Sequence, residues 1–297
     1  MPPSNPLPGQ GRLIPPGNLW ARLREQDRQA QALGALHRIQ TEQRWLDDQG
    51  VRFLVRALPS LSDKPRQTDP GPAPANPFLP PEPALTLGDW APNHRMVLNK
   101  FNVLDHHVLI VTRQFEHQEQ LLKQGDFAAL AAALGEIDGL GFYNGGQEAG
   151  ASQTHKHLQL VPLAGEHLPL EPWFEQGEGD QLAALPFRHA FRRLPAGTWR
   201  QPDQTADLLL SLYLEMLAQV AIVALARDGE LWQGAPYNLL LRRHWILLVP
   251  RRRESFAGVS VNALGFAGSL FVPCPAALEQ ISRLGPFRLL TEVGAGY

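Results

Sequence analysis

The chain has 297 residues, of which 44% are hydrophobic and 19% are charged, so it can bury one large core or two ordinary ones. The formal net charge of −2 argues against a general nucleic-acid binder, which usually carries a basic surplus. One cysteine (Cys274), no apolar run of roughly 20 residues and no signal-like N-terminal segment predict a cytoplasmic protein without a membrane partner.

The N-terminal part is predicted to begin with an arm and a helix. Residues 1–17 are rich in Pro and Gly, which indicates a flexible arm. Apolar residues at mostly helical spacings predict a helix over 18–49, and the run 51–58 predicts a strand. Residues 59–83 contain many prolines, which are excluded from the interior of a sheet. They predict a long loop, and such loops are often functional where they cross a site.

The central part is predicted to contain a hairpin, a helix and a third strand. Residues 96–99 and 107–112 predict the two hairpin strands, and 115–134 predicts the helix. Residues 139–143 lead into a glycine-rich loop, and 155–162 predicts the strand that follows it.

The C-terminal part begins after a polar, proline-containing connector over 164–186. A strongly apolar helix is predicted over 206–227, followed by a hairpin with strands 237–241 and 245–250. A short helix is predicted over 275–284. No exact repeat is present, and strands and helices do not alternate regularly, so the pattern predicts an α+β fold.

The most informative segment is 144–159, with the sequence NGGQEAGASQTHKHLQ. His155, His157 and Gln159 occupy alternate positions, and a strand sends such residues to one face. The three glycines upstream allow the backbone to approach an anion closely. Two imidazoles and an amide that face a glycine loop indicate phosphate chemistry.

A histidine in this setting can act as a nucleophile on phosphorus. Its reference pKa of about 6.5 leaves much of it neutral at pH 7, and its attack splits a difficult displacement into two steps through a covalent intermediate. The other ring nitrogen must then be held by an acceptor, so that the attacking nitrogen carries the lone pair. The second histidine, the glutamine, the loop backbone, Ser152 and Gln153 could supply donors to the phosphate oxygens.

Two other interpretations of the histidines are open. Alternating histidines occur on ordinary exposed strands, and His-x-His is also a common pair of metal ligands. A metal site would need further ligands, and no spacing singles out any of the candidates, which are His94, His106, His107 and His117. The glycine loop together with Ser152, Gln153 and Gln159 favours phosphate chemistry over both.

The segment GASQ-x-HKHLQ resembles the active-site motif of the diadenosine tetraphosphate phosphorylases, also called ATP adenylyltransferases, of the histidine-triad superfamily. Other segments also resemble this family: NPFLPPEP (76–83), HRMVLNKFNVLDHHVLIVT (94–112), and PYNLL (236–240) with WILLVP (245–250) and SVNALGFAG (260–268). Together these segments extend over most of the chain from about residue 50.

The resemblance implies an α+β fold of the histidine-triad type, an antiparallel sheet with packed helices that is elaborated by a C-terminal region. We expect a flexible arm over 1–17 and a histidine-triad-like catalytic domain over 18–184. An ATP adenylyltransferase region over 185–297 either forms a separate domain or completes the same one.

The resemblance also implies unequal roles for the motif residues. His157 matches the nucleophile, and His155 matches the histidine that orients the site and contacts phosphate. Gln159 replaces the third histidine of the hydrolase branch. Glutamine at this position resembles the nucleotidyltransferases, in which a phosphate-bearing acceptor rather than water resolves the covalent intermediate.

Further positions match family residues that contact the nucleotide. The phosphate-binding positions are Asn144, Gly150, Ser152 and Gln153. Asn99 matches an asparagine that contacts the ribose, and Lys64 resembles a lysine near the polyphosphate. Lys156 should point away from the catalytic face, and the run Arg251–Arg253 is interpreted as a solvated charge cluster.

The implied activity is phosphorolysis of diadenosine tetraphosphate to ADP and ATP through an adenylyl-histidine, with related exchange of ADP with phosphate or sulfate. The implied partners are dinucleoside polyphosphates, ATP, ADP and inorganic phosphate, for a monomer or homodimer. A divalent cation, Mg²⁺, is expected to arrive with the nucleotide rather than in a protein metal site. The alternatives are another histidine-triad nucleotidyltransferase, such as a hexose-1-phosphate uridylyltransferase, a dinucleoside polyphosphate hydrolase, or a non-catalytic sensor of these nucleotides.

Overall fold

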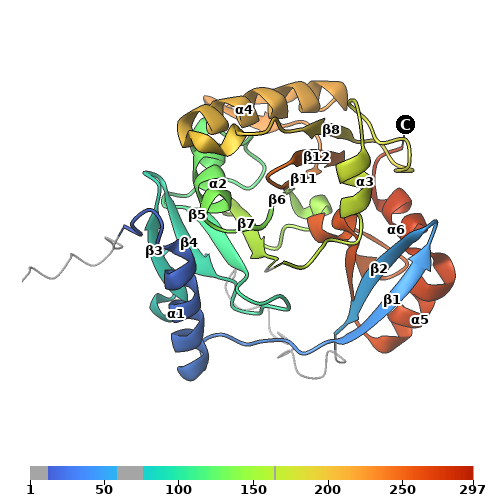
Figure 1. Cartoon of the computed structure of the whole chain (residues 1–297), viewed down its shortest axis with the longest axis horizontal. Helices are drawn as coiled ribbons and strands as arrows, with labels where there is room; N and C mark the ends of the chain where they lie inside the picture. The colour runs from blue at the N-terminus through green and yellow to red at the C-terminus, as the bar shows by residue number, and fades with distance from the viewer. Residues whose placement is uncertain (1–12, 59–75, 164, 297) are drawn as a thin grey trace, which may run out of the picture.

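The computed structural model describes residues 13–58, 76–163 and 165–296. Its centre is an eight-stranded sheet in which every neighbouring pair of strands is antiparallel (Figure 1). In spatial order the strands are β3 (Thr86–Trp90), β4 (His94–Leu98), β5 (Val108–Thr112), β7 (His157–Pro162), β6 (Gly139–Gly145), β11 (Tyr237–Leu241), β12 (Trp245–Pro250) and β8 (Ala190–Arg193). The predicted α+β fold with a large antiparallel sheet is confirmed.

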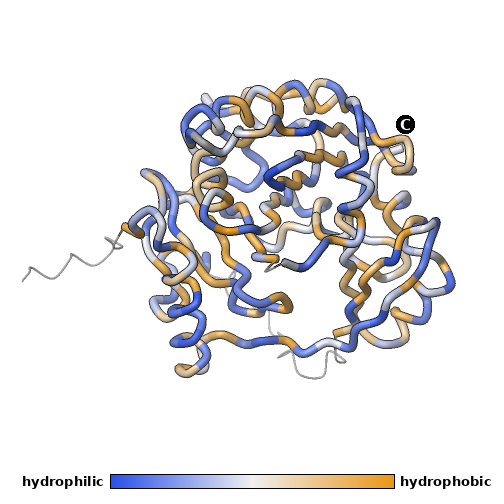
Figure 2. Tube along the Cα trace, in the orientation of Figure 1, coloured by the Kyte–Doolittle hydropathy of each residue, from blue (hydrophilic) through white to orange (hydrophobic). Residues whose placement is uncertain are grey.

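Helices cover one face of this sheet. They are α1 (Leu19–Ala32), α2 (Gln124–Glu136) and α4 (Pro202–Gln219), and their buried residues share one apolar core with Ile110, Leu158 and Leu160 of the sheet. The mixed hydrophilic and hydrophobic colours along α1 in Figure 2 fit a helix with one buried face, because Leu19 and Leu23 are fully buried.

A second layer covers the other face. It contains α3 (Glu171–Gln176), α5 (Pro275–Leu284), α6 (Pro286–Val293) and a three-stranded sheet of β1 (Glu42–Asp48), β2 (Val51–Ala57) and β15 (Ser269–Val272). Figure 1 shows β1, β2, α5 and α6 together on one side of the molecule. A separate apolar core joins this layer to the sheet residues Phe142, Val161 and Leu240.

Four short 3₁₀ helices and two two-stranded ladders complete the described elements. The helices are η2 (Pro83–Leu85), η3 (Gln147–Ala149), η4 (Thr198–Arg200) and η5 (Ala263–Ala267). The ladders pair β9 (Ala224–Arg227) with β10 (Glu230–Gln233) and β13 (Ser255–Phe256) with β14 (Val259–Ser260).

The C-terminal region contributes directly to the central sheet. Strand β11 pairs with β6 on one side and β12 on the other, so strands from both halves of the chain form one continuous sheet. Residues Asn238 of β11 and Asn144 of β6 lie opposite each other. The C-terminal part therefore reaches the strand that leads into the glycine loop.

Three predicted helices differ from the structure. The first ends at Ala32, and the rest of the range 18–49 contains β1, which pairs with β2. Gln49 and Gly50, with φ of 48° and 80°, form the turn between these strands. Positive φ at both central residues is the geometry of a tight hairpin turn, and this turn signal outweighs the helical spacing of the preceding residues.

The other two helices are shifted or shorter than predicted. Helix α2 begins at Gln124 rather than 115, because the carbonyl of Glu116 and the N–H of Gln118 are used in bonds to Lys156 and Thr154. Helix α4 ends at Gln219, and residues 224–227 form a strand that turns at Asp228-Gly229. An Asp-Gly pair is a strong hairpin signal.

Several strand predictions are confirmed. They are the strand near 51–58, the two hairpins 96–99 with 107–112 and 237–241 with 245–250, and the motif strand. The helix over 275–284 is also confirmed. The elements that were not predicted include strands β3, β8 and β15 and helices α3 and α6. In the described parts of the chain, none of the helices combines the length and apolarity that a membrane span requires.

Candidate active site

The motif strand sends its alternate residues to the two layers. Leu158 and Leu160 lie in the core under α2 and α4, whereas Val161 lies in the core of the second layer. His157 and Gln159 therefore project toward the second layer, as the alternation predicts. His155 lies just before β7 and pairs with His117 in an isolated bridge.

His157 is held in one tautomer by the backbone. Its Nδ1 lies 2.8 Å from the carbonyl oxygen of His155, which can only accept, so Nδ1 donates and Nε2 carries the lone pair. This oxygen is the acceptor that a nucleophilic histidine needs on its second ring nitrogen. Burial lowers the pKa of His157 to about 4, so the imidazole is neutral at pH 7.

His155 has partners for both ring nitrogens. Nε2 lies 2.8 Å from the carbonyl oxygen of Thr112 and therefore donates to it, and Nδ1 accepts from the side-chain amide of Asn76 at 2.9 Å. Phe78 packs against the rings of both motif histidines, with centroid distances of 5.6 and 5.5 Å. This geometry fits the predicted orienting role. Contact with phosphate would require His155 to exchange one of these bonds.

Gln159 is oriented by a chain of hydrogen bonds that starts at Asn99. The amide nitrogen of Asn99 lies 3.1 Å from Nδ1 of His107, and Nε2 of His107 lies 2.9 Å from Oε1 of Gln159. If Nδ1 accepts from Asn99, then Nε2 must donate to the oxygen of Gln159. The NH₂ group of Gln159 takes no part in this chain of hydrogen bonds and can donate to a ligand. Burial lowers the pKa of His107 to about 4, which favours the neutral ring that this chain requires.

The side chain of Gln118 separates the two strands that carry the site. The ladder between β6 and β7 stops at Phe142 and Gln159, although its register would bring Asn144 opposite His157. Gln118 takes the place of this pair: its Oε1 accepts from the N–H of His157 at 2.9 Å, and its Nε2 donates to the carbonyls of Asn144 (2.9 Å) and His157 (3.3 Å). One buried amide thus fixes the backbone of the predicted nucleophile.

We expect Gln118→Leu to lower kcat roughly 100-fold with a smaller change in KM, because a displacement of about 1 Å at a reacting group has an effect of this size. The substitution keeps the volume but removes all three hydrogen bonds. Gln124→Leu, at an exposed position of α2, is the matched control. Steady-state kinetics of both variants check this, and a Gln118→Leu enzyme with unchanged kcat would contradict the positioning role.

Asn144 connects the site to the C-terminal region. Its Oδ1 accepts from Asn238 Nδ2 at 2.8 Å and from the N–H of Ala263, the first residue of η5, at 3.0 Å. Asn238 Oδ1 in turn accepts from Arg251 at 2.6 Å. With its side-chain oxygen occupied, Asn144 can offer a ligand only its amide nitrogen.

The interpretation of Arg251 as part of a solvated charge run is wrong. Its side chain is buried, and its guanidinium donates to Asn238 and to four carbonyls, those of Val261, Arg253, Glu254 and Val293. Burial lowers its pKa to about 9. Arg252 and Arg253 do contact solvent and pair with Glu292. Only the first arginine of the run is structural.

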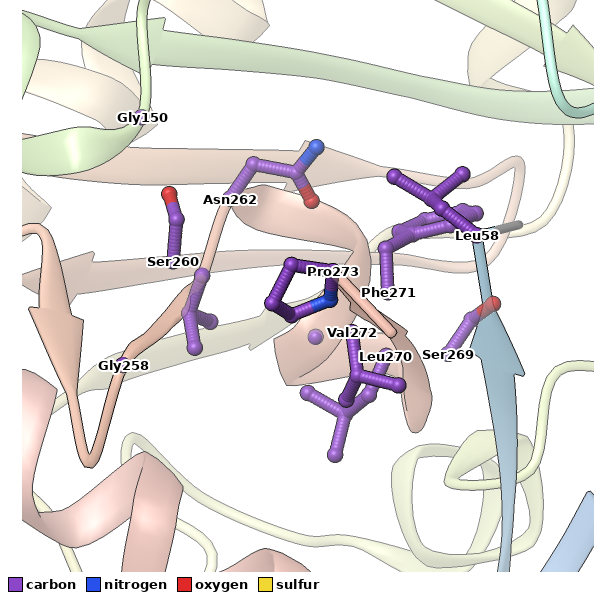
Figure 3. A pocket seen from close by; sticks show the side chains of 12 residues that line it. Leu58, Gly150, Gly258, Ser260, Asn262, Ser269, Leu270, Phe271, Val272 and Pro273 are labelled. Atoms are coloured by element: carbon purple, nitrogen blue, oxygen red, sulfur yellow. The ribbon is translucent and has the colours of Figure 1, made fainter. Parts of the chain in front are cut away.

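Gly150 lies where the glycine loop meets the C-terminal region. Its φ of +89° is in the left-handed region, and a Cβ there would lie 3.0 Å from the Cα of Asn262, so both conformation and space favour glycine. Gly150 and Asn262 line a pocket of about 260 Å³ (Figure 3). Ser152 and Gln153 are exposed on the segment between this glycine and the motif strand.

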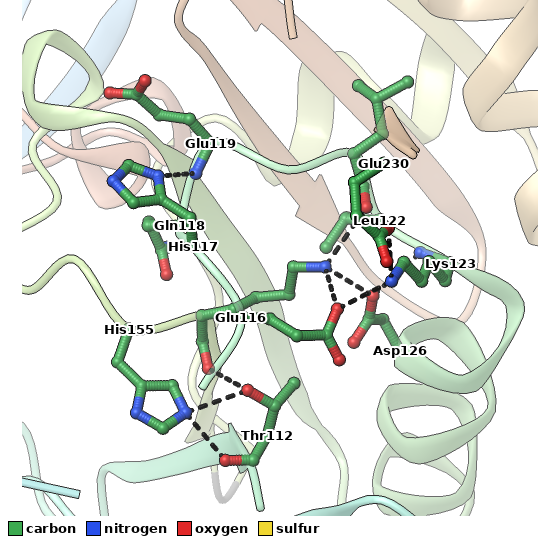
Figure 4. Close-up of polar contacts among 12 residues, drawn as sticks. Thr112, Glu116, His117, Gln118, Glu119, Leu122, Lys123, Asp126, His155 and Glu230 are labelled. Carbon is green, nitrogen blue, oxygen red and sulfur yellow. Dashed lines mark hydrogen bonds and ion pairs between the residues drawn. The ribbon is translucent and has the colours of Figure 1, made fainter. Parts of the chain in front are cut away.

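Lys156 lies on the opposite side of the strand, as predicted, and is fully buried. Its Nζ lies 2.9 Å from Glu116, 3.2 Å from the carbonyl of Leu121 and 3.5 Å from Asp126. Figure 4 shows this network, in which Lys123 joins Glu116 to Glu230. The network attaches the segment that carries Gln118 to the back of the motif strand.

A larger cleft of about 830 Å³ opens beside the motif strand, between the central sheet and β2. Its walls include Val161, two residues after Gln159, and the segment 102–106 that follows Asn99. The cleft is large enough for a nucleoside, and its lining begins three residues after Asn99, the predicted ribose contact.

The protonation of the buried histidines should make the protein less stable in acid. Because the pKa values of His157 and His107 are about 4 in the folded chain and about 6.5 when unfolded, the unfolded chain binds more protons between these values. The free energy of unfolding should decrease as the pH is lowered through this window, by up to about 1.4 kcal/mol per pH unit for each histidine. Urea denaturation at several pH values measures the slope. His157→Gln should reduce this slope, and an unchanged slope would refute the lowered pKa of His157.

The structure brings most of the predicted site together. His155, His157, Asn144 and Gly150 lie around the start of β7. Asn99 lies level with the far end of this strand and reaches Gln159 through His107, and Lys64 lies outside the described residues. Within the described ranges, no group of three or more His, Cys, Asp or Glu residues could hold a metal ion.

Several residues of the site were not assigned a role from the sequence. They are Asn76, His107, Gln118, Asn238 and Asn262. His107 was considered only as a possible metal ligand, and its partner Gln159 is 52 positions away. Asn76, Asn238 and Asn262 do lie in segments that resemble the family, which was the available signal. Gln118 had none, since its role depends on where two strands stop pairing.

The antiparallel sheet presents a neutral histidine, a glutamine two residues later and a glycine loop, the arrangement that the resemblance implies for a nucleotidyltransferase of the histidine-triad type. The family model of the Ap4A phosphorylase N-terminal domain matches residues 10–176, and that of the ATP adenylyltransferase C-terminal domain matches 183–296. Ap4A is diadenosine tetraphosphate. The chain belongs to the Ap4A phosphorylase family.

Relatives in Saccharomyces cerevisiae agree with this assignment. Protein APA1 is 27% identical in an alignment that covers 84% of this chain and 85% of the relative. Diadenosine 5',5'''-P1,P4-tetraphosphate phosphorylase 2 is 27% identical over 78% of this chain and 79% of its own. The crystal structure of yeast Ap4A phosphorylase Apa2 in complex with Ap4A has the same fold, with a TM-score of 0.77 and 24% identity over 93% of this chain and 97% of that one.

Proposed function

We propose that this protein phosphorolyses diadenosine tetraphosphate to ADP and ATP, the activity of its family, through a covalent adenylyl-histidine. The observation that carries the proposed mechanism is the hydrogen bond from Nδ1 of His157 to the carbonyl of His155. It leaves Nε2 of a neutral, buried ring with a free lone pair at the predicted nucleophile.

In the first step, Nε2 of His157 attacks the α-phosphorus of one adenosine end. The N–P bond forms as the bond from the α-phosphorus to the bridging oxygen breaks, and ATP leaves. The proton stays on Nδ1, where the carbonyl of His155 stabilises the positive charge that develops on the ring. The NH₂ of Gln159, held by His107, is in a position to donate to a phosphate oxygen.

In the second step, an oxygen of inorganic phosphate attacks the same phosphorus. The N–P bond breaks, ADP leaves, and His157 returns to its neutral state. Two in-line displacements at one site predict net retention of configuration at phosphorus. Exchange of ADP with phosphate or sulfate would use the same intermediate.

The nucleotide would be held by residues around the motif strand and the glycine loop. Asn99 would contact the ribose in the larger cleft, and Asn144, Gly150, Ser152, Gln153 and Lys64 would contact phosphates. A divalent cation, Mg²⁺, would arrive with the nucleotide and neutralise polyphosphate charge. We expect the protein to act as a monomer or a homodimer. With Cys274 as its sole cysteine, we expect the protein to work in the cytoplasm.

Product analysis with and without phosphate tests this function. Phosphorolysis predicts ADP and ATP in equal amounts that accumulate only when phosphate is present. AMP as the product would indicate hydrolysis instead, and tight binding of Ap4A without any product would indicate a sensor. The same assay with UDP-hexose and other dinucleoside polyphosphates tests the other nucleotidyltransferase activities.

A further inference from the structure

Two arginines of the described chain are buried, and they differ in how their donors are used. The guanidinium of Arg251 has five oxygen acceptors. Arg56, which is 7% exposed, has one hydrogen bond, from Nη1 to Ser269 Oγ at 2.6 Å, and lies 5.8 Å from the ring centroid of Phe271. Among the described residues, no carboxylate forms an ion pair with it.

A buried cation without a counter-charge is costly. Removing a charge from water costs several kcal/mol unless a partner compensates it, and burial accordingly lowers the pKa of Arg56. Glu166 is the carboxylate whose charge raises the pKa of Arg56, but it is exposed and makes no ion pair with this arginine. Most of the five N–H donors of the guanidinium therefore lack an acceptor in the described part of the chain.

The position of Arg56 explains where these donors point. Along β2, Phe53 and Val55 enter the second core, whereas Leu54 and Arg56 line the 830 Å³ cleft. No nitrogen of Arg56 is among the buried polar atoms without a partner, so its unused N–H groups reach solvent in the cleft.

The hydrogen-bond partner of Arg56 connects the cleft to the smaller pocket. This partner, Ser269, lines both the cleft and the smaller pocket beside Gly150, and Figure 3 shows Ser269 beside the end of β2. The lining of the cleft also includes Val161, four residues along β7 from His157, or roughly 13 Å at the rise of a strand.

We propose that Arg56 binds a phosphate group of the reactants. A guanidinium matches the oxygens of a phosphate with parallel hydrogen bonds, and such a ligand supplies the missing negative charge. This inference rests on the proposed function and adds to it an anion site in the cleft that Arg56 and the motif-strand residue Val161 both line. The phosphate belongs either to the polyphosphate of the dinucleotide or to the inorganic phosphate acceptor.

The test compares Arg56→Met, Arg56→Lys and the control Arg52→Met with the wild type. Arg52 is an exposed arginine of the same strand. The KM for phosphate is measured at saturating Ap4A, and the KM for Ap4A at saturating phosphate. We expect one of these constants to rise roughly 10- to 100-fold in Arg56→Met, the size expected for lost charge-assisted hydrogen bonds. Arg56→Lys should recover part of the loss, and Arg52→Met should stay close to the wild type.

Single-turnover formation of the adenylyl-enzyme identifies the source of the phosphate group. Slower formation with a raised KM for Ap4A assigns Arg56 to the polyphosphate. Normal formation with a raised KM for phosphate assigns it to the acceptor. Thermal unfolding of ligand-free Arg56→Met should occur at or above the wild-type temperature, because an apolar side chain replaces an uncompensated buried charge.

Unchanged KM values in a folded Arg56→Met would overturn the proposal. If this variant does not fold, Arg56→Lys receives the same measurements, and wild-type constants for it would also overturn the proposal. Calorimetric titration with tripolyphosphate and with inorganic phosphate gives a readout that needs no turnover. Binding that depends on Arg56 in a protein that does not phosphorolyse Ap4A would support the anion site while rejecting the proposed function.

Discussion

Replacing His157 with alanine is expected to lower the rate of Ap4A phosphorolysis by roughly 10⁴- to 10⁶-fold, the range seen when a covalent nucleophile is removed. The alanine cannot form the N–P bond, and the remaining donors cannot replace a nucleophile. Wild-type enzyme incubated briefly without phosphate, with substrate labelled in the adenosine and α-phosphate, should retain an acid-labile, base-stable label. The variant should retain none.

A matched control and a structural check accompany this experiment. His244→Ala removes an exposed histidine in the turn between β11 and β12 and should leave both label and rate unchanged. Removal of the His157 ring also frees the carbonyl of His155, so circular dichroism must show that the variant is folded. A label that persists in folded His157→Ala would refute the proposed intermediate.

The sequence predicted the elements whose signals are local. Strands β11 and β12 are short, largely apolar runs on either side of a polar turn, helix α5 has helical spacing, and the motif strand was predicted from alternation alone. Strand β1 was missed because its partner β2 and the turn at Gln49-Gly50 decide its conformation. Pairing across a turn is a tertiary effect that the spacing of apolar residues does not report.

The site was predictable where the motif is contiguous. Nδ1 of His157 bonds to the carbonyl of the residue two positions earlier, so that part of the chemistry lies within three residues. The contacts of Gln118 and His107 join segments about 40 to 50 positions apart. Such contacts depend on the strand order of the sheet. Without that order Gln118 could not be distinguished from an ordinary polar side chain, and His107 had only its place in the family-like segment 94–112.

Lys156 has the largest expected effect on stability. Lys156→Met should reduce the free energy of unfolding by about 3–5 kcal/mol, the usual cost of removing one partner of a buried ion pair. Glu116 and Asp126 lose the cation between them. Urea denaturation with a constant m-value measures the loss. Lys123→Met is the control: this side chain is 47% exposed, and its contacts should contribute less than about 1 kcal/mol.

The pH dependence of Lys156→Met distinguishes lost charge compensation from lost packing. Burial raises the pKa of Glu116 and Asp126, but their hydrogen bonds and charges, including those of Lys156, lower both below their ordinary values. A lowered folded pKa contributes stability above the unfolded value of about 4 and loses it as the pH falls. The deficit of Lys156→Met should therefore shrink as the pH drops through this range. Lys156→Met/Glu116→Gln should also recover part of the loss, and a deficit that is constant with pH and unaffected by the second substitution would mean that packing is the cause.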